Sequence, residues 1–422
     1  MSVTDVAKPA GSVRGKRHWR LLLAFFVGTG FAAGGWFGWS YWRYRGAMDE
    51  IDADIIAGRY AIACRNLEAL LSRTSDSNGR IGYLLGSCEL ARGRNQAADK
   101  AWAAVTPGCA FAQKAIESRI HLLEESGQYA GAERLAFEAA RDPRNDGTAL
   151  LVLLVPLYRD QGRLDEAGRL IEDRWNYLNA SGQGELEPAV KLVLEHVALD
   201  LRPTPVESSR TSLERAAQLA PGDDRVWLAQ ANLALHTGAH DEAGRRLDAC
   251  LKNRPDDVPV WRARLRFGIA TKRIDVVTLA MSHLPVNELS AASLHRTNAW
   301  LAAQRNDVAG EIRELQLLVT ADPADLTALA RLVELSEKEH QPDTAAELAR
   351  TKAEIGRLLE RYQKLYDRNQ PIRDAEELAR LAEALGRPFE SRAFLTIAIS
   401  EEPARTDLRK RLARLGTTPA PQ

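Results

Sequence analysis

From residue 44 to residue 410 the apolar positions recur three and four residues apart, which is the spacing of helices that bury one face. In the stretch 224–257 two such helices follow each other. The first carries Trp227, Ala231 and Ala234 on one face, because residues three and four apart are neighbours on a helix. A glycine turn, a second apolar stripe and a closing proline follow at Gly238, Ala243, Leu247, Cys250 and Pro255. The pattern predicts a helical hairpin.

The same pattern recurs along the chain at intervals of about 34 or 35 residues. Each of several turn glycines is followed by a small residue of the second helix: Gly58, Gly93, Gly127 and Gly162 precede Ala63, Ala98, Ala132 and Ala167. One hairpin cannot bury its apolar face alone, so successive hairpins must stack. The units are expected to begin near residues 44, 79, 113, 148, 190, 224, 258, 292, 326 and 372.

These residues resemble the marks of the tetratricopeptide repeat (TPR) family, and the chain resembles its bacterial membrane-anchored type. The resemblance covers residues 44–410. It implies an all-α fold, a right-handed α-solenoid of about ten TPR-like helical hairpins, preceded by a single transmembrane helix. In TPR proteins the first helices of successive repeats line a groove that holds a peptide or another protein.

Interruptions of the repeat period predict how the chain is divided. A segment rich in Gly, Asn and Ser interrupts the period after residue 175, and a helical period that is too long for one repeat helix runs on to Pro371. The predicted parts are a disordered basic cytoplasmic arm (1–18), a transmembrane helix (19–43), N-terminal repeats (44–175), an irregular loop (176–189), central repeats (190–342), an extended helix (343–370), a terminal repeat (371–416) and a disordered tail (417–422).

The stretch from Leu21 to Trp42 contains no charged residue. At ~1.5 Å per residue it is long enough to cross a hydrocarbon core of roughly 30 Å. It is interpreted as an uncleaved signal anchor, since the alternative, a cleaved signal peptide, lacks a clean cleavage site. Basic residues concentrate before it, which predicts a single-pass membrane protein with a cytoplasmic N-terminus and a periplasmic or otherwise extracytoplasmic repeat domain.

Three glycines share one face of this predicted span: Gly30, Gly34 and Gly38. Their spacing would let two membrane helices pack closely, which predicts a homo-oligomer through the span. The alternative is that glycine is simply common in membrane helices. The lipid bilayer is thus an expected partner through residues 21–42.

Composition excludes some classes of function. Lys+Arg 57 against Asp+Glu 57 leaves no net charge, so a general nucleic-acid binder is not indicated. The four cysteines form no CxxC motif. Cys64 and Cys88 fall on helices expected to touch, so a disulfide between them is one interpretation if the domain lies outside the cytoplasm. Two buried thiols are the other.

No catalytic motif, metal-ligand spacing or cofactor fingerprint stands out. The eight histidines are scattered, and no paired acids depart from the repeat pattern. The chain is therefore expected to bind rather than catalyse, with no cofactor and no metal.

The resemblance implies that a set of side chains faces the groove, because of their places in the repeat: Arg225, Asn232, Arg262, Arg266, Arg296 and Trp300. Asn232 matches the asparagine that clamps a terminal carboxylate in some TPR domains, whereas Arg266 stands where a second asparagine would be. A strip rich in guanidinium groups suits carboxylates, so an acidic protein or peptide partner is expected. The alternative is that these arginines are solvated or pair with nearby glutamates.

Two functions follow from these features. The first is a membrane-tethered scaffold that binds a peptide or protein partner outside the cytoplasm. The second is a non-catalytic accessory subunit of a cell-envelope enzyme, assembly or secretion complex, in which the partner performs the chemistry.

Overall fold

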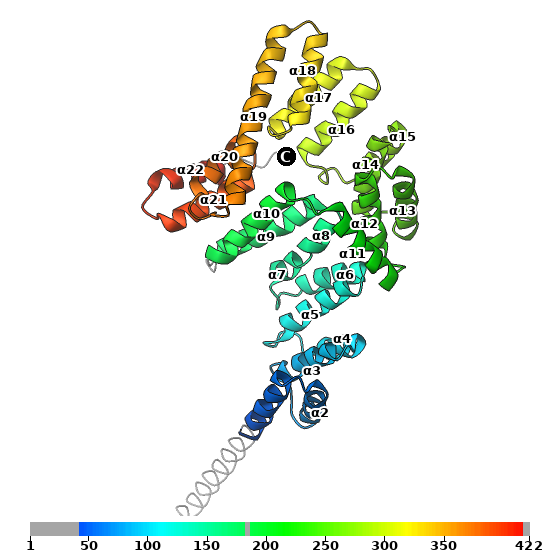
Figure 1. Cartoon of the computed structure of the whole chain (residues 1–422), viewed down its shortest axis with the longest axis vertical. Coiled ribbons are helices and arrows are strands. Elements are labelled where there is room, and N and C mark those ends of the chain that lie inside the picture. The colour runs from blue at the N-terminus through cyan, green and yellow to red at the C-terminus, as the bar shows by residue number, and fades with distance from the viewer. Residues whose placement is uncertain (1–41, 182–185, 417–422) are drawn as a thin grey trace, which may run out of the picture. The chain divides into compact units, whose positions relative to one another are not determined.

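The structure, a computed structural model, describes residues 42–181 and 186–416. Across these two ranges the regular elements are helices, and no strand occurs. The chain divides into two compact units, Met1–Ala115 and Ile116–Gln422. Figure 1 shows the helices of both units in chain order.

The first unit holds a helix over residues 42–56, followed by α2 (Tyr60–Leu71), α3 (Arg80–Ala91) and α4 (Asn95–Ala103). Its core includes Met48, Ile51, Ala63, Cys64, Leu67, Ile81 and Cys88. Cys64 and Cys88 are buried free thiols, which is the second of the two interpretations of the sequence. Burial raises the pKa of Cys88 to about 12, which keeps this thiol protonated.

In the second unit, consecutive helices pair as hairpins. Close pairs are α12 (Asp224–His236) with α13 (His240–Asn253), α14 (Val258–Ala270) with α15 (Ile274–His283), α16 (Ala291–Gln304) with α17 (Val308–Ala321), α18 (Leu326–Lys338) with α19 (Pro342–Arg368), and α20 (Ala375–Ala384) with α21 (Pro388–Glu401). Before them come α5 (Ala112–Glu125), α6 (Tyr129–Ala140), α7 (Gly147–Val152), α8 (Val155–Asp160), α9 (Leu164–Ser181), α10 (Leu186–Leu201) and α11 (Val206–Leu219), and after them α22 (Thr406–Gly416). This succession of two-helix units is a TPR-like solenoid.

Two local signals shape these hairpins. Residues with a left-handed backbone turn the chain between the two helices, as at Gly162 (φ 67°) and Gly238 (φ 76°), where a side chain would be strained. Aspartates cap first helices: Asp223, Asp257 and Asp325 accept hydrogen bonds from backbone N–H groups in the first turns of α12, α14 and α18. The caps recur with the repeat, so the sequence sets where these helices begin.

The predicted membrane span requires a correction. None of the helices within residues 42–181 and 186–416 is both long and apolar enough to cross a bilayer. The predicted span 21–42, with Gly30, Gly34 and Gly38, lies outside the described residues except for residue 42. The transmembrane part of the predicted fold, the single-pass membrane localisation, and the partners and oligomer inferred from the span are therefore not supported.

The repeat stacking is irregular around α10. Helix α9 continues to Ser181, into the segment 176–189 where a loop was predicted, and α10 begins at Leu186. Helix α10 packs against α9 and α21, whereas α11 packs against α12. The turn between α8 and α9 lies against α12, where the carbonyl of Gln161 accepts a hydrogen bond from Nδ2 of Asn232. Further along, the segment predicted as an extended helix (343–370) is largely α19.

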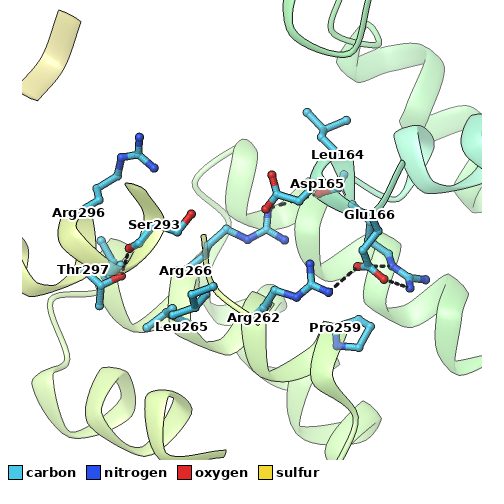
Figure 2. A pocket seen from close by; sticks show the side chains of 14 residues that line it. Leu164, Asp165, Glu166, Pro259, Arg262, Leu265, Arg266, Ser293, Arg296 and Thr297 are labelled. Atoms are coloured by element: carbon cyan, nitrogen blue, oxygen red, sulfur yellow. Dashed lines mark hydrogen bonds and ion pairs between the residues drawn. The ribbon is translucent and has the colours of Figure 1, made fainter. Parts of the chain in front are cut away.

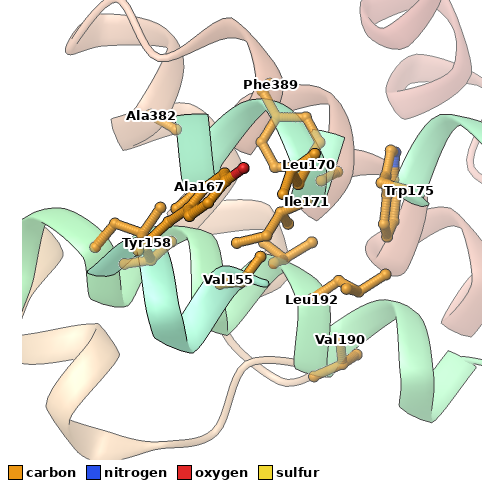
Figure 3. Packing of buried hydrophobic residues seen from close by; sticks show 14 of the residues in the cluster. Val155, Tyr158, Ala167, Leu170, Ile171, Trp175, Val190, Leu192, Ala382 and Phe389 are labelled. Carbon is orange, nitrogen blue, oxygen red and sulfur yellow. The ribbon is translucent and has the colours of Figure 1, made fainter. Parts of the chain in front are cut away.

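The main core of the second unit contains residues that are far apart in the sequence. Tyr158 and Ile171 belong to the same buried cluster as Tyr362 and Phe389. Figure 3 shows Phe389 of α21 beside the α9 side chains of this cluster. The hairpin α20–α21 is thus packed onto the α9–α10 pair.

Candidate functional site

Arg225, predicted to face a groove, lies in the core of the second unit and is 6% exposed. Its Nε donates to Oε2 of Glu133 at 2.5 Å, and its Nη1 donates to Oδ1 of Asp257 at 2.9 Å. Arg225 therefore joins α6, α12 and the start of α14. Arg225 is buried and its guanidinium group is paired within the chain, which corrects its predicted role.

Glu133 is the centre of this buried charged network. Its carboxylate also accepts hydrogen bonds from Oη of Tyr158 at 2.7 Å and from Nη2 of Arg163 at 2.9 Å. Burial by itself would raise the pKa of Glu133, but the guanidinium groups of Arg163 and Arg225 lower it to about 2. Glu133 is thus ionised at neutral pH and holds three segments together.

Asn232 is 7% exposed, and its side chain is used within the chain. Its Nδ2 donates to the carbonyl of Gln161 at 2.8 Å, and its Oδ1 accepts from Nη2 of Arg266 at 3.1 Å. Arg266 also donates to the carbonyl of Gly162 at 3.4 Å. The α8–α9 turn therefore takes the donors that the resemblance assigned to a partner's terminal carboxylate.

Arg262 bridges two carboxylates of the chain itself. Its Nη2 lies 2.7 Å from Oε1 of Glu288 and 3.3 Å from Oε1 of Glu166. Figure 2 shows the contact with Glu166. This is the alternative in which the arginines pair with nearby glutamates, and it ties α14 to α9 and to the α15–α16 loop.

Arg262 and Arg266 line a cavity of about 360 Å³ between the start of α9, α14 and α16 (Figure 2). Arg266 is exposed in this cavity, and among the described residues no carboxylate lies within ion-pair distance of it. The surrounding protein reduces the solvation of Arg266 and lowers its pKa, an effect that the nearby Asp165 opposes. Arg266 is thus a cation that the chain neutralises only in part.

Arg296 and Trp300 line a second cavity of about 610 Å³ between α16, α17 and α18. Its apolar lining is Ala299, Trp300, Ala303, Leu315, Leu318 and Ala328, and its polar lining is Arg296, Glu311, Asp325, Thr327 and Arg331. Arg296 is half exposed and pairs with Asp322 at 3.3 Å and Asp325 at 3.0 Å. This cavity offers apolar surface beside guanidinium groups.

The two cavities share Arg296 and together follow the first helices α14, α16 and α18. They are called here the first-helix groove. Its charged groups are mainly arginines paired with carboxylates. Because Arg296 is half exposed and its pair with Asp322 is open to solvent, that pair contributes less than about 1 kcal/mol, and a carboxylate from outside can compete for this guanidinium. The groove can therefore bind apolar and acidic groups side by side.

Sequence reasoning missed Arg331 and Glu133. Arg331, whose Nε donates to Oε1 of Glu311 at 2.6 Å, is one place out of register with Arg262 and Arg296 in the repeat. Glu133 lies on a second helix, away from the expected groove. Its one signal is its position beside Ala132, on the buried stripe of α6. In the parts of the chain that the structure describes, no group of His, Cys, Asp and Glu side chains could hold a metal ion.

No protein-family model and no curated protein matches this sequence. Solved structures with a similar arrangement include a tetratricopeptide repeat protein from Parabacteroides merdae, with 14% identity over 64% of this chain and 100% of that chain (TM-score 0.29). Yeast Tom70 has 10% identity over 87% of this chain and 93% of that chain (TM-score 0.28). The APC/C hetero-tetramer Cut9-Hcn1 has 13% identity over 86% and 88% (TM-score 0.33). At these scores the TPR-like assignment rests on the hairpins themselves.

Proposed function

We propose that the protein is an interaction scaffold that binds an acidic, apolar segment of a protein partner in the first-helix groove. The observation that carries this proposal is the second cavity, which apolar side chains including Trp300 and Leu315 line together with Arg296 and Arg331. Aromatic and arginine side chains around a concave surface are the usual anchors of protein interfaces.

The size and charge of the groove support a polypeptide as the occupant. It extends over three first helices, so one small molecule would leave much of it uncovered. An apolar side chain fits the second cavity, and carboxylates one repeat apart would reach Arg296 and Arg266. Arg266 is the stronger of the two anchors, because no carboxylate of the described chain pairs with it.

The proposal assigns binding, and no reaction, to this groove. The cations that line it are arginines, which stay protonated at any physiological pH and so cannot exchange protons with a substrate. Their planar guanidinium groups instead grip carboxylates in a fixed geometry.

We expect Thr327→Trp to weaken partner binding by at least about tenfold, since a loss of one apolar anchor costs 1.4 kcal/mol or more. Thr327 is exposed and lines the second cavity, so a tryptophan there fills the cavity without disturbing the core. The matched control is Thr320→Trp, at an exposed position of α17 outside the groove. Its affinity should be that of the unchanged protein.

The probe is a twelve-residue peptide selected from a random display library on the full chain, with binding measured by fluorescence anisotropy. The proposal predicts selected peptides that combine Asp or Glu with large apolar residues. It fails if the selected peptides carry no acidic residues, or if they bind the Thr327 and Thr320 variants equally well.

A further inference from the structure

Helix α21 makes a contact that simple repeat stacking does not produce. In a solenoid each repeat touches only its neighbours, yet α21 packs against α10. Nδ1 of His196 on α10 lies 3.2 Å from Oε1 of Glu390 on α21, and Nη2 of Arg387 lies 3.3 Å from Oδ2 of Asp200. The last hairpin therefore closes the helices α10 to α21 into a loop.

The contact has a small aromatic centre. The Phe389 ring lies 4.6 Å from the His196 ring and 6.2 Å from the Trp175 ring, which it meets edge-on. Figure 3 shows Phe389 and Trp175 with the aliphatic side chains of α9. Phe389 is buried, so undocking α21 would expose it.

The charged part of the contact is centred on a buried carboxylate, Glu390, which faces two cations. Glu390 is 2% exposed, and a carboxylate this buried needs a compensating charge. Oη of Tyr362 on α19 donates to it at 2.5 Å, but a phenol is neutral. The cations are His196 and, at 3.4 Å, Arg387. Nε2 of His196 also lies 3.5 Å from Glu172 on α9, so the imidazolium links α9, α10 and α21.

We propose that the α20–α21 hairpin is a latch that closes this loop of helices, and that protonated His196 is the group that keeps it docked. When His196 loses its proton, Glu172 and Glu390 face each other across a neutral ring and the latch loosens. The α12–α19 repeats, which carry the first-helix groove, are then free to change their curvature.

The groups around the latch set the direction of its pH response. Burial lowers the pKa of His196, but hydrogen bonds with Glu172 and Glu390 raise it to about 9. Because this folded-state pKa lies above the ordinary value of 6.5, the stabilisation is complete below pH 6.5 and is lost as the pH rises through about 9. Other charged or titratable groups near the contact are Asp200, Arg387, Tyr362 and, just after α17, Asp322. The cavity that His196 lines also carries Asp165, Arg169 and Glu288.

The charge on His196 can be tested with two substitutions in the full chain. His196→Gln keeps hydrogen-bonding capacity and loses the charge, whereas His196→Lys keeps a charge up to a higher pH. At pH 7 we expect the amide hydrogens of α20 and α21 to exchange at least about tenfold faster in the glutamine variant. A tenfold change corresponds to losing an interaction that shifts the pKa of His196 by about one unit. Protection in α12–α15 should be unchanged.

The pH series on the unchanged protein provides an independent test that needs no variant. Between pH 7 and pH 10, protection factors of α20 and α21 should fall while those of α12–α15 hold, and the lysine variant should keep its latch protected at pH 10. The latch is overturned if the loss of protection is spread evenly over the second unit. It is equally overturned if the glutamine and lysine variants behave alike, because a purely structural role would not distinguish them.

Discussion

Replacing Glu133 with alanine is expected to lower the free energy of unfolding of the second unit by about 3–5 kcal/mol. Glu133 is 8% exposed, and its side chain accepts hydrogen bonds from Tyr158, Arg163 and Arg225. Its removal leaves Arg163 and Arg225 buried without this carboxylate. Removing one member of such a network costs far more than the network adds to stability, because the remaining charges stay desolvated.

Glu138→Ala is the matched control for this experiment, since Glu138 lies on the same helix and is exposed. Its effect should stay within about 0.5 kcal/mol. Urea unfolding followed by circular dichroism measures both variants. Equal midpoints for the two variants would show that Glu133 does not stabilise the fold in the way described.

The same carboxylate predicts a dependence on acid. Its pKa falls from 4.5 to about 2 on folding, so the stability it contributes is present above pH 4.5 and is lost as the pH falls toward 2. The difference in unfolding free energy between the unchanged protein and Glu133→Gln should be largest at neutral pH. The part of this difference that arises from the pKa shift of Glu133 is roughly 3 kcal/mol, and it should vanish near pH 2. A difference that is constant over this range would contradict the assignment.

The hairpins could be predicted from the sequence because their signals are local. Apolar spacing sets the helices, and glycines at 58, 93, 127, 162 and 238 adopt the left-handed backbone that a turn needs. Other repeats turn on Lys272, Asn306 and His340, which also have positive φ. A search for glycine misses these turns, although asparagine is known to tolerate this conformation.

The candidate site could be predicted only in part, because it depends on contacts between distant repeats. Arg262, Arg266 and Arg296 do line the groove, since their positions follow from helical register. Arg225 and Asn232 do not, because α6 and the α8–α9 turn pack against α12 and take up their side chains. No feature of residues 224–257 alone carries that information. The partner of each arginine is likewise set by which carboxylate the tertiary fold brings near.

Turn glycines that look alike in the sequence are also expected to differ in their cost of replacement. Gly127 (φ 72°) and Gly238 (φ 76°) occupy the same place in their hairpins. A Cβ on Gly238 would meet no atom within 4 Å. The cost of Gly238→Ala should therefore come only from placing alanine in the left-handed conformation, about 1–2 kcal/mol. A Cβ on Gly127 would lie 2.6 Å from the carbonyl oxygen of Ala216 and 2.9 Å from its Cα.

Because Gly127 meets the backbone of α11 rather than a flexible side chain, relief requires that helix to move. Gly127→Ala should therefore cost a further 1–3 kcal/mol, the usual penalty of overpacking. Urea midpoints of the two variants measure the difference, and since both share the same φ, it isolates the contact with Ala216. If the two alanine variants were equally stable, the α5–α6 turn could not be packed against α11 as closely as the structure places it. A larger loss of stability in Gly127→Ala than in Gly238→Ala would tie that packing directly to the stability of the second unit.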